Sequence, residues 1–174
     1  FSDMTFDGLY WDAADLYAWV CNQPYADGSR VFLSGQSMGG YVAASVAPQL
    51  QPYGLILMCP GAGMWYGCAQ RADMITQSGK DYADLEGLVY KMAFNYGMAA
   101  HPDPFEEAKG YKGPAVVVRA DDDQLVDDES CERYAALYGD VTFVRTSGGG
   151  HKFATIPART ACEQAVSSFI QTHL

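Results

Sequence analysis

The sequence lacks the long apolar runs and the basic clusters that mark two large classes of protein. No uninterrupted apolar stretch approaches the ~18 residues that a transmembrane helix needs, and the longest runs are of strand length. Lysine and arginine together number 11 against 21 aspartate and glutamate residues, so the net charge is −10 at pH 7. Binding to nucleic acid or to an anionic membrane surface needs clustered positive charge, and we therefore expect neither partner.

Paired cysteine motifs are also missing. The five cysteines are Cys21, Cys59, Cys68, Cys131 and Cys162. Their number is odd, no C-x-x-C pair occurs, and the spacings match no zinc motif. We therefore predict buried or free thiols in a reducing compartment, with one disulfide as the alternative, and we expect no metal and no organic cofactor. The sequence shows no signal peptide, and we expect a cytoplasmic location.

What remains is the composition of a globular domain. The chain has 174 residues, of which 49% are hydrophobic and 18% are charged. A chain of this length buries roughly 70% of its unfolded surface, so it needs no disulfide or metal to fold.

Segments of strand and helix periodicity alternate along the chain. The pattern predicts strands at 30–34, 53–59, 114–120 and 141–146 and helices at 11–21, 41–47, 85–96, 128–138 and 160–174. Continuous apolar strands that alternate with helices predict an α/β fold, with a mostly parallel sheet and helices on both faces. Functional residues are then expected at the carboxyl ends of the strands.

A G-x-S-x-G motif follows the first predicted strand, as Gly35-Gln36-Ser37-Met38-Gly39. In a nucleophile elbow the serine occupies a strained turn between a strand and a helix, and both flanking elements are predicted here. Gly35 and Gly39 lack a Cβ, which lets the chain turn sharply. The alternative is a glycine turn with a solvated serine.

A base and an acid follow the later strands. Asp121–Asp123 come after the strand at 114–120, and His151 comes after the strand at 141–146. The chain order Ser, Asp, His is the order of the α/β-hydrolase triad. The other two histidines, His101 and His173, are better explained as surface residues. Two of the three aspartates are expected to be solvated turn or cap residues.

Several segments resemble those of bacterial α/β-hydrolases. KGPAVVVRADDDQLV is similar to their strand-and-acid segment, and aligning Val126 with the last valine of that pattern places the acid on Asp123. GQSMGG resembles the nucleophile elbow, and SGGGHKF resembles the histidine loop. The opening FSDMTFDGLYWDAADLYAWV is similar to the serine aminopeptidase-like and cinnamoyl (feruloyl) esterase-like branch. The likeness is strongest at 1–60 and 104–155.

The resemblance implies a serine esterase with Ser37 as nucleophile, His151 as base and Asp123 as the orienting acid. It places one oxyanion-hole donor on the Met38 N–H and implies no metal or organic cofactor. Aryl (hydroxycinnamoyl) or short-chain acyl esters are the expected substrates, and no substrate-binding residue is assigned. The alternatives are a peptidase or acyltransferase on the same triad, and an inactive association module.

The resemblance also implies a single domain over 1–174, the C-terminal portion of the fold, with a cap or lid at about 61–108. The family's earlier strands and its second oxyanion donor have no counterpart here. We therefore expect the strand at 30–34 to pair with a second copy or with a missing N-terminal segment. Arg119-Ala120 replaces the family's His-Gly, so the acid loop is expected to differ. The aromatic residues of the cap line an acyl pocket or form the core of the cap. These residues are Trp65, Tyr66, Tyr82, Tyr90, Phe94 and Tyr96.

Overall fold

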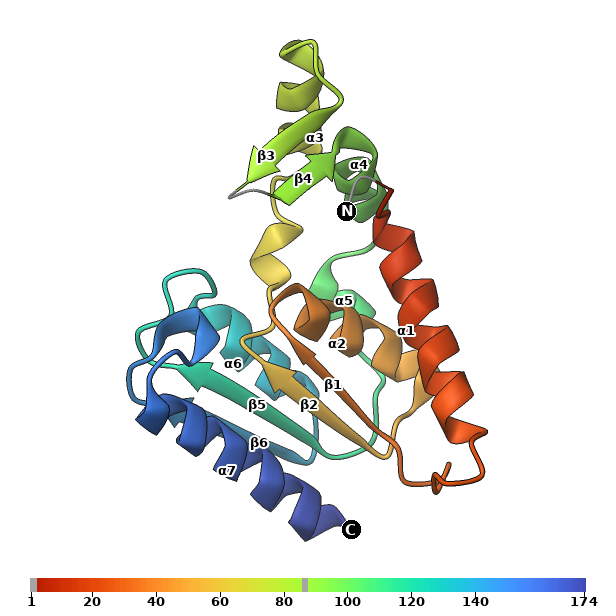
Figure 1. The fold of residues 1–174 in the computed structure, drawn as a ribbon, viewed down its shortest axis with the longest axis vertical. Coiled ribbons are helices and arrows are strands. Elements are labelled where there is room, and N and C mark those ends of the chain that lie inside the picture. Colours follow the sequence, from red (N-terminus) through yellow and green to blue (C-terminus); the bar gives the residue numbers. More distant parts are fainter. Residues whose placement is uncertain (1–2, 86–87) are drawn as a thin grey trace.

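A four-stranded parallel sheet forms the centre of the molecule. The computed structural model describes residues 3–85 and 88–174. The strands are β1 (Phe32–Gln36), β2 (Gly54–Met58), β5 (Ala115–Ala120) and β6 (Val141–Thr146). They are hydrogen-bonded in the order β1-β2-β5-β6, and every neighbouring pair is parallel (Figure 1). The predicted α/β fold with a mostly parallel sheet is therefore confirmed.

Helices cover both faces of this sheet. Helix α7 (Ile156–His173) lies on one face, and α2 (Met38–Leu50) and α6 (Asp128–Leu137) lie on the other (Figure 1). All six residues of β5 are buried as a result. Helix α2 has an unbroken buried stretch from Gly40 to Ala47. Most of these side chains are small, which lets the helix pack close to β1 and β2.

The ends of several elements differ from the sequence prediction. Helix α1 (Phe6–Cys21) begins five residues before the predicted start at Trp11, because the Thr5 hydroxyl accepts a hydrogen bond from the Gly8 N–H and caps it. Helix α2 does not stop at Pro48. The proline lies in the last turn, and the helix continues to Leu50 although Pro48 has no N–H to donate to the Ala44 carbonyl.

The chain between β2 and β5 carries six short elements. They are η1 (Ala62–Met64), α3 (Cys68–Gln77), β3 (Tyr82–Leu85), β4 (Leu88–Lys91), α4 (Met92–Ala100) and α5 (Pro104–Glu107). The prediction of one helix over 85–96 is wrong in its first half, because 88–91 pair with 82–85 as an antiparallel hairpin. Residues 86 and 87 of that prediction lie outside the described part. The β-branched and aromatic residues Val89 and Tyr90 favour a strand there.

A second hydrophobic cluster joins this segment to the sheet domain. Its buried members are Phe6, Tyr41, Cys68, Phe94 and Met98. Among the aromatic residues of the segment, Phe94 belongs to the cluster, and Trp65 and Tyr90 pack against it. Tyr66, Tyr82 and Tyr96 are 40–43% exposed. For Phe94, Trp65 and Tyr90 the structure therefore favours the interpretation as a packed core.

Strand β1 forms one edge of the sheet, and an apolar groove of about 440 Å³ lies beside it. The groove is lined by α1, β1 and the start of α2, among them Leu9, Leu16, Val20, Phe32, Met38 and Val42. None of the six cap aromatics lines it. Leu16 on α1 is 61% exposed, and its neighbour Trp19 is 55% exposed. Apolar side chains of α1 are therefore open to solvent beside this edge of the sheet.

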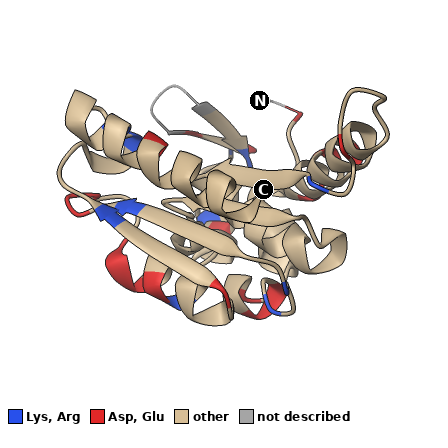
Figure 2. Cartoon of the chain, turned by 90° about the horizontal axis from the view of Figure 1, so that it is seen from below, with Lys and Arg blue, Asp and Glu red and all other residues tan. Residues whose placement is uncertain are grey.

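The sheet carries few charged residues, and most of the thiols are buried. Basic residues are few and interspersed with acidic ones, and the strands are mostly uncharged (Figure 2). Four cysteines are buried and Cys21 is half-buried, and all five are free thiols. Within the described ranges, no helix has the length and apolarity required to cross a membrane.

Candidate active site

Ser37 occupies a strained turn between β1 and α2. Its backbone angles are φ 55° and ψ −122°, a region that L-residues rarely adopt and that costs of order 1–3 kcal/mol. Three backbone hydrogen bonds hold it there. The Ser37 N–H donates to the Met58 carbonyl at 2.9 Å, and its own carbonyl accepts from Gly61 at 2.9 Å and from Tyr41 at 3.0 Å. Serine is a favoured N-cap, yet the Ser37 hydroxyl makes no capping hydrogen bond.

The glycines of the elbow have unequal roles. A Cβ at Gly35 would lie 2.1 Å from the Gly39 carbonyl oxygen, so only glycine fits at position 35. A Cβ at Gly39 would meet nothing within 4 Å, so the prediction that Gly39 avoids a clash is wrong. The second tight position after Gly35 is Gly40, where a Cβ would lie 3.0 Å from the Pro60 Cα. Gly40 therefore lets α2 approach the chain that leaves β2.

His151 and Asp123 form a hydrogen-bonded pair. The His151 Nδ1 lies 2.9 Å from the Asp123 Oδ2, and the side chains are 12% and 0% exposed. The Asp123 Oδ1 accepts the N–H groups of Leu125 at 2.8 Å and Val126 at 3.0 Å. Burial acts to raise the pKa of Asp123, but the hydrogen bonds from Val126, His151 and Leu125 outweigh it and lower that pKa. An ionised Asp123 accepts a hydrogen bond from Nδ1–H, which leaves Nε2 as the basic nitrogen of the neutral ring.

The two aspartates before Asp123 bind the histidine loop. The Asp121 Oδ1 accepts the Gly148 N–H at 2.8 Å, and the Asp122 Oδ1 accepts the Gly150 N–H at 2.7 Å. Both aspartates are exposed, as predicted. Their role in holding the loop was not predicted, because sequence spacing gives no register between two loops 27 and 28 residues apart. The assignment of the acid to Asp123 agrees with its burial and its contact with His151.

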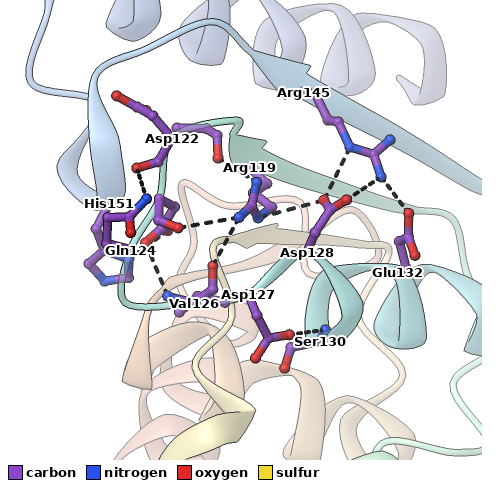
Figure 3. A network of polar contacts seen from close by, with 12 residues as sticks. Arg119, Asp122, Gln124, Val126, Asp127, Asp128, Ser130, Glu132, Arg145 and His151 are labelled. Carbon is purple, nitrogen blue, oxygen red and sulfur yellow. Dashed lines mark hydrogen bonds and ion pairs between the residues drawn. The ribbon is translucent and has the colours of Figure 1, made fainter.

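Arg119 organises the acid loop from within the protein (Figure 3). It is 6% exposed, and its guanidinium donates to the carbonyls of Ala120 at 2.8 Å, Asp123 at 3.3 Å and Val126 at 3.3 Å. Its Nε lies 3.6 Å from Asp128 at the start of α6. Arg119 was expected to alter the acid loop. The structure gives the reason, because this one buried cation donates hydrogen bonds to three carbonyls of the loop. In the sequence, the replacement of the family's His-Gly by Arg119-Ala120 was what pointed to a special role for this residue.

The serine and the histidine loop are tied together through their neighbours. The Gln36 side-chain amide donates to the His151 carbonyl oxygen at 3.0 Å, and the Cys59 Sγ lies 3.8 Å from the same oxygen. Ser37 follows β1, Asp123 follows β5 and His151 follows β6, so all three lie at the carboxyl ends of the parallel strands. Among the hydrogen bonds of the described residues, none joins the Ser37 hydroxyl to the His151 ring. Such contacts are often long before substrate binds.

The first residue of α2 presents a backbone donor beside the serine. The N–H of Met38 belongs to the first turn, where N–H groups have no partner within the helix. A Cβ at Gly61 would lie 3.2 Å from the Ser37 carbonyl carbon and 3.4 Å from the Met38 nitrogen. Glycine at position 61 therefore limits crowding next to this N–H.

Three of the four strained non-glycine residues of the described chain lie near the carboxyl ends of the strands. The non-glycine residues with positive φ in the described chain are Ser37, Gln51, Cys59 and Phe153. Ser37 and Cys59 follow β1 and β2, and Phe153 closes the 3-10 turn that carries His151. Strained conformations persist only where the surroundings over-determine them, and they concentrate at functional sites.

Comparison with known proteins agrees with this arrangement. The family model described as the alpha/beta hydrolase fold matches residues 3–155. The chain belongs to this family. The resemblance predicted from the sequence is thereby confirmed. No curated protein matches the sequence of this alpha/beta hydrolase.

Solved structures share its fold at low sequence identity. Est1E from Butyrivibrio proteoclasticus superimposes with a TM-score of 0.78 at 17% identity, over 99% of this chain and 72% of Est1E. A thermophilic esterase from Thermogutta terrifontis has a TM-score of 0.68 at 20% identity, over 98% of this chain and 73% of the esterase. The monoacylglycerol lipase of Paleococcus ferrophilus has a TM-score of 0.69 at 13% identity, over 98% of this chain and 77% of the lipase.

Proposed function

We propose that this hydrolase cleaves carboxylic esters through a Ser37–His151–Asp123 triad and an acyl-enzyme intermediate. The observation that carries the proposal is the His151–Asp123 pair at 2.9 Å, tied to the turn of a strained Ser37. Family membership supports it, as do the structural neighbours whose names include an esterase and a lipase.

Each group has a defined step in this mechanism. The Ser37 Oγ attacks the ester carbonyl carbon, and its proton passes to the His151 Nε2. Asp123 keeps the ring in the required tautomer and stabilises the imidazolium that forms. The Met38 N–H stabilises the tetrahedral oxyanion. The imidazolium then gives its proton to the departing alcohol, and a water activated by the same nitrogen releases the acid.

The substrate class we favour is a short-chain acyl or hydroxycinnamoyl ester. A structure of Est1E with bound ferulic acid is among the neighbours, and it covers 97% of this chain at 15% identity. The exposed aromatic residues Tyr66, Tyr82 and Tyr96 belong to the segment between β2 and β5, which we propose acts as a cap over the site. Comparing ester, amide and acyl-acceptor substrates separates an esterase from a peptidase or acyltransferase on the same triad.

The decisive experiment measures hydrolysis of a short-chain p-nitrophenyl ester by the wild-type chain, by Ser37→Ala and by Ser34→Ala. Ser34 lies three residues earlier on β1 and is exposed, so it is a matched control. We expect hydrolysis and fluorophosphonate labelling to be lost in Ser37→Ala and kept in Ser34→Ala. A Ser37→Ala chain that is still labelled would overturn the assignment of the nucleophile. Background rates in all three chains would favour the inactive module.

We also propose that the open edge of β1 is covered by a strand from outside residues 1–174 of a longer chain. The apolar groove and the exposed Leu16 and Trp19 support this, because bare sheet edges with apolar surroundings tend to pair. The structural neighbours support it too, since about a quarter of each, for example the 28% of Est1E left by 72% coverage, has no counterpart here. Analytical ultracentrifugation should show only weak, concentration-dependent self-association of this chain through the uncovered edge, without a stable dimer. A monodisperse monomer with β1 protected from hydrogen exchange would contradict the proposal, and a stable dimer would point to a second copy.

A further inference from the structure

Cys59 lies beside the His151–Asp123 pair and has no step in the mechanism above. It follows β2 directly, is 0% exposed, and adopts a left-handed conformation with φ 44°. Burial and the neighbouring charge of Asp123 raise the pKa of its thiol, so it is not a competing nucleophile at neutral pH. Its Sγ, a carboxylate oxygen of Asp123 and a ring nitrogen of His151 all lie within 4.8 Å of one another. A soft, a hard and a borderline donor therefore converge on one point.

We propose that Cys59, Asp123 and His151 form a binding site for a thiophilic divalent cation such as Zn²⁺ or Cd²⁺, which inhibits the hydrolase. The inhibition rests on the proposed function, whereas the binding rests on the three donors alone. Of the described residues, these three are the group of cysteine, histidine and carboxylate side chains close enough to share an ion.

The spacing of the donors is close to what such an ion requires. Zinc binds imidazole nitrogen and carboxylate oxygen at about 2.0–2.2 Å and thiolate sulfur at about 2.3 Å, so tetrahedral donors lie about 3.3–3.8 Å apart. The His151–Asp123 separation of 2.9 Å must widen slightly, and the sulfur, within 4.8 Å of both partners, must approach. His151 is the donor with access to solvent, and the glycines at 148–150 beside it, all with positive φ, let its loop adjust.

The charges of this site balance without further groups. The thiol releases its proton to solvent when the cation binds, because a metal-bound thiol is deprotonated. One thiolate and one carboxylate then neutralise the two positive charges of the ion. A neutral assembly is what a buried position tolerates, because an uncompensated charge there is costly.

The mode of inhibition follows from the tautomer of His151. In the free enzyme the ring proton is on Nδ1, from which it is donated in a hydrogen bond to Asp123. A cation on Nδ1 uses that lone pair, so the ring proton moves to Nε2. A protonated Nε2 cannot accept the proton of Ser37, and the first step of acylation stops. The cation also displaces Asp123 from the ring that it orients.

The test titrates the chain with CdCl2 and ZnCl2, with MgCl2 as a hard-cation control. Half-buried Cys21 is replaced by serine throughout, because a solvent-accessible thiol binds such ions adventitiously. Two readouts are taken, the rate of ester hydrolysis relative to each variant's own rate without metal, and the ultraviolet absorption of the Cd–thiolate bond. The variants are Cys59→Ala, Cys59→Ser in case the cavity left by alanine prevents folding, and the control Cys68→Ala, a buried cysteine in α3.

We expect Cd²⁺ and Zn²⁺ to inhibit ester hydrolysis, and a chelator to restore it. Mg²⁺ should have no effect. Losing a ligand should weaken inhibition at least ~10-fold in both Cys59 variants, and the Cd–thiolate absorption should vanish in them while it persists in Cys68→Ala. Equal inhibition or equal absorption in the Cys59 variants would overturn the proposal. If Cys59-dependent absorption appears but no form of the chain hydrolyses esters, the binding site stands and the proposed function is what fails.

Discussion

Two histidines of this chain each contact a carboxylate at 2.9 Å, yet their surroundings suit them to different tasks. The His151 Nδ1 meets Asp123, and among the hydrogen bonds of the described residues none involves its Nε2. His101 has both ring nitrogens occupied, Nδ1 by Glu107 and Nε2 by Asp7, each at 2.9 Å. A ring with both nitrogens engaged has none left to exchange a proton with a ligand. The number of occupied nitrogens therefore separates an acid–base site from a structural bridge.

The connections of His101 explain its bridging role. It lies between α4 and α5, whereas Asp7 is on α1, so its two contacts join elements far apart in sequence. The Tyr10 hydroxyl donates to Glu107 at 2.5 Å, and the Trp65 indole N–H donates to the His101 carbonyl at 3.1 Å. This cluster fastens the segment between β2 and β5 to α1. The sequence prediction of a surface residue is wrong for His101, whose side chain is 16% exposed.

Replacing each histidine in turn tests whether His151 and His101 differ in function as proposed. His151→Ala should lower kcat for ester hydrolysis by about four orders of magnitude or more, because the proposed base is lost. His101→Ala should leave kcat within a few-fold while lowering stability. Rates and unfolding midpoints of both variants are measured side by side. Comparable losses of kcat would show that the free nitrogen is not what distinguishes them.

Asp123→Asn should have the next largest effect, a loss of about 10⁴ in kcat. An amide can donate to Nδ1 and so favours the wrong tautomer of His151. Asp122→Asn is the matched control, because the Asp122 Oδ1 accepts a backbone N–H from Gly150 rather than the Nδ1–H of His151. We expect the control to retain activity within a few-fold. A control as impaired as Asp123→Asn would mean that the loop position, rather than the tautomer, limits the rate.

Arg119→Met should act on the acid loop and should reduce activity less than Asp123→Asn does. Three loop carbonyls lose a donor, which we expect to lower the free energy of unfolding by about 2–3 kcal/mol. A less ordered Asp123 should reduce kcat about 10- to 100-fold, and the reduction should be in kcat more than in KM. Arg119→Lys keeps the charge but not the planar fork, so it should recover only part of both losses. Full recovery by lysine would show that charge alone positions the loop.

The smallest effect concerns the pH dependence of the His101 bridge. Burial acts to lower the pKa of His101, but the hydrogen bonds and charges of Glu107 and Asp7 outweigh it and raise the pKa above 6.5. A raised pKa means that the bridge contributes its full stability below pH 6.5 and loses it as the pH rises through the folded-state pKa. His101→Gln should therefore cost about 1–3 kcal/mol at pH 6 and less at pH 9 in urea unfolding. An equal cost at both values would exclude a charged bridge.

The sequence predicted those parts of the molecule that depend on local patterns. Strands such as 115–120 and the turn after β1 are encoded within a few residues, so both could be located. The pairing of 82–85 with 88–91 was missed because its stability comes from contacts between two short segments. The roles of Asp121, Asp122 and Cys59 also escaped prediction, since they depend on which loops meet in space. His101 was misjudged for the same reason, because its partner Asp7 lies 94 residues away.

The strained backbone of Ser37 has a consequence for anyone who engineers this chain. Glycine adopts such angles without a steric penalty, so Ser37→Gly should relieve roughly 1–3 kcal/mol of strain, less the entropy that glycine adds to the unfolded chain. A library screened for thermal stability alone would therefore enrich a substitution that removes the proposed nucleophile. For this protein, stability and activity have to be selected together, because at position 37 they favour different residues.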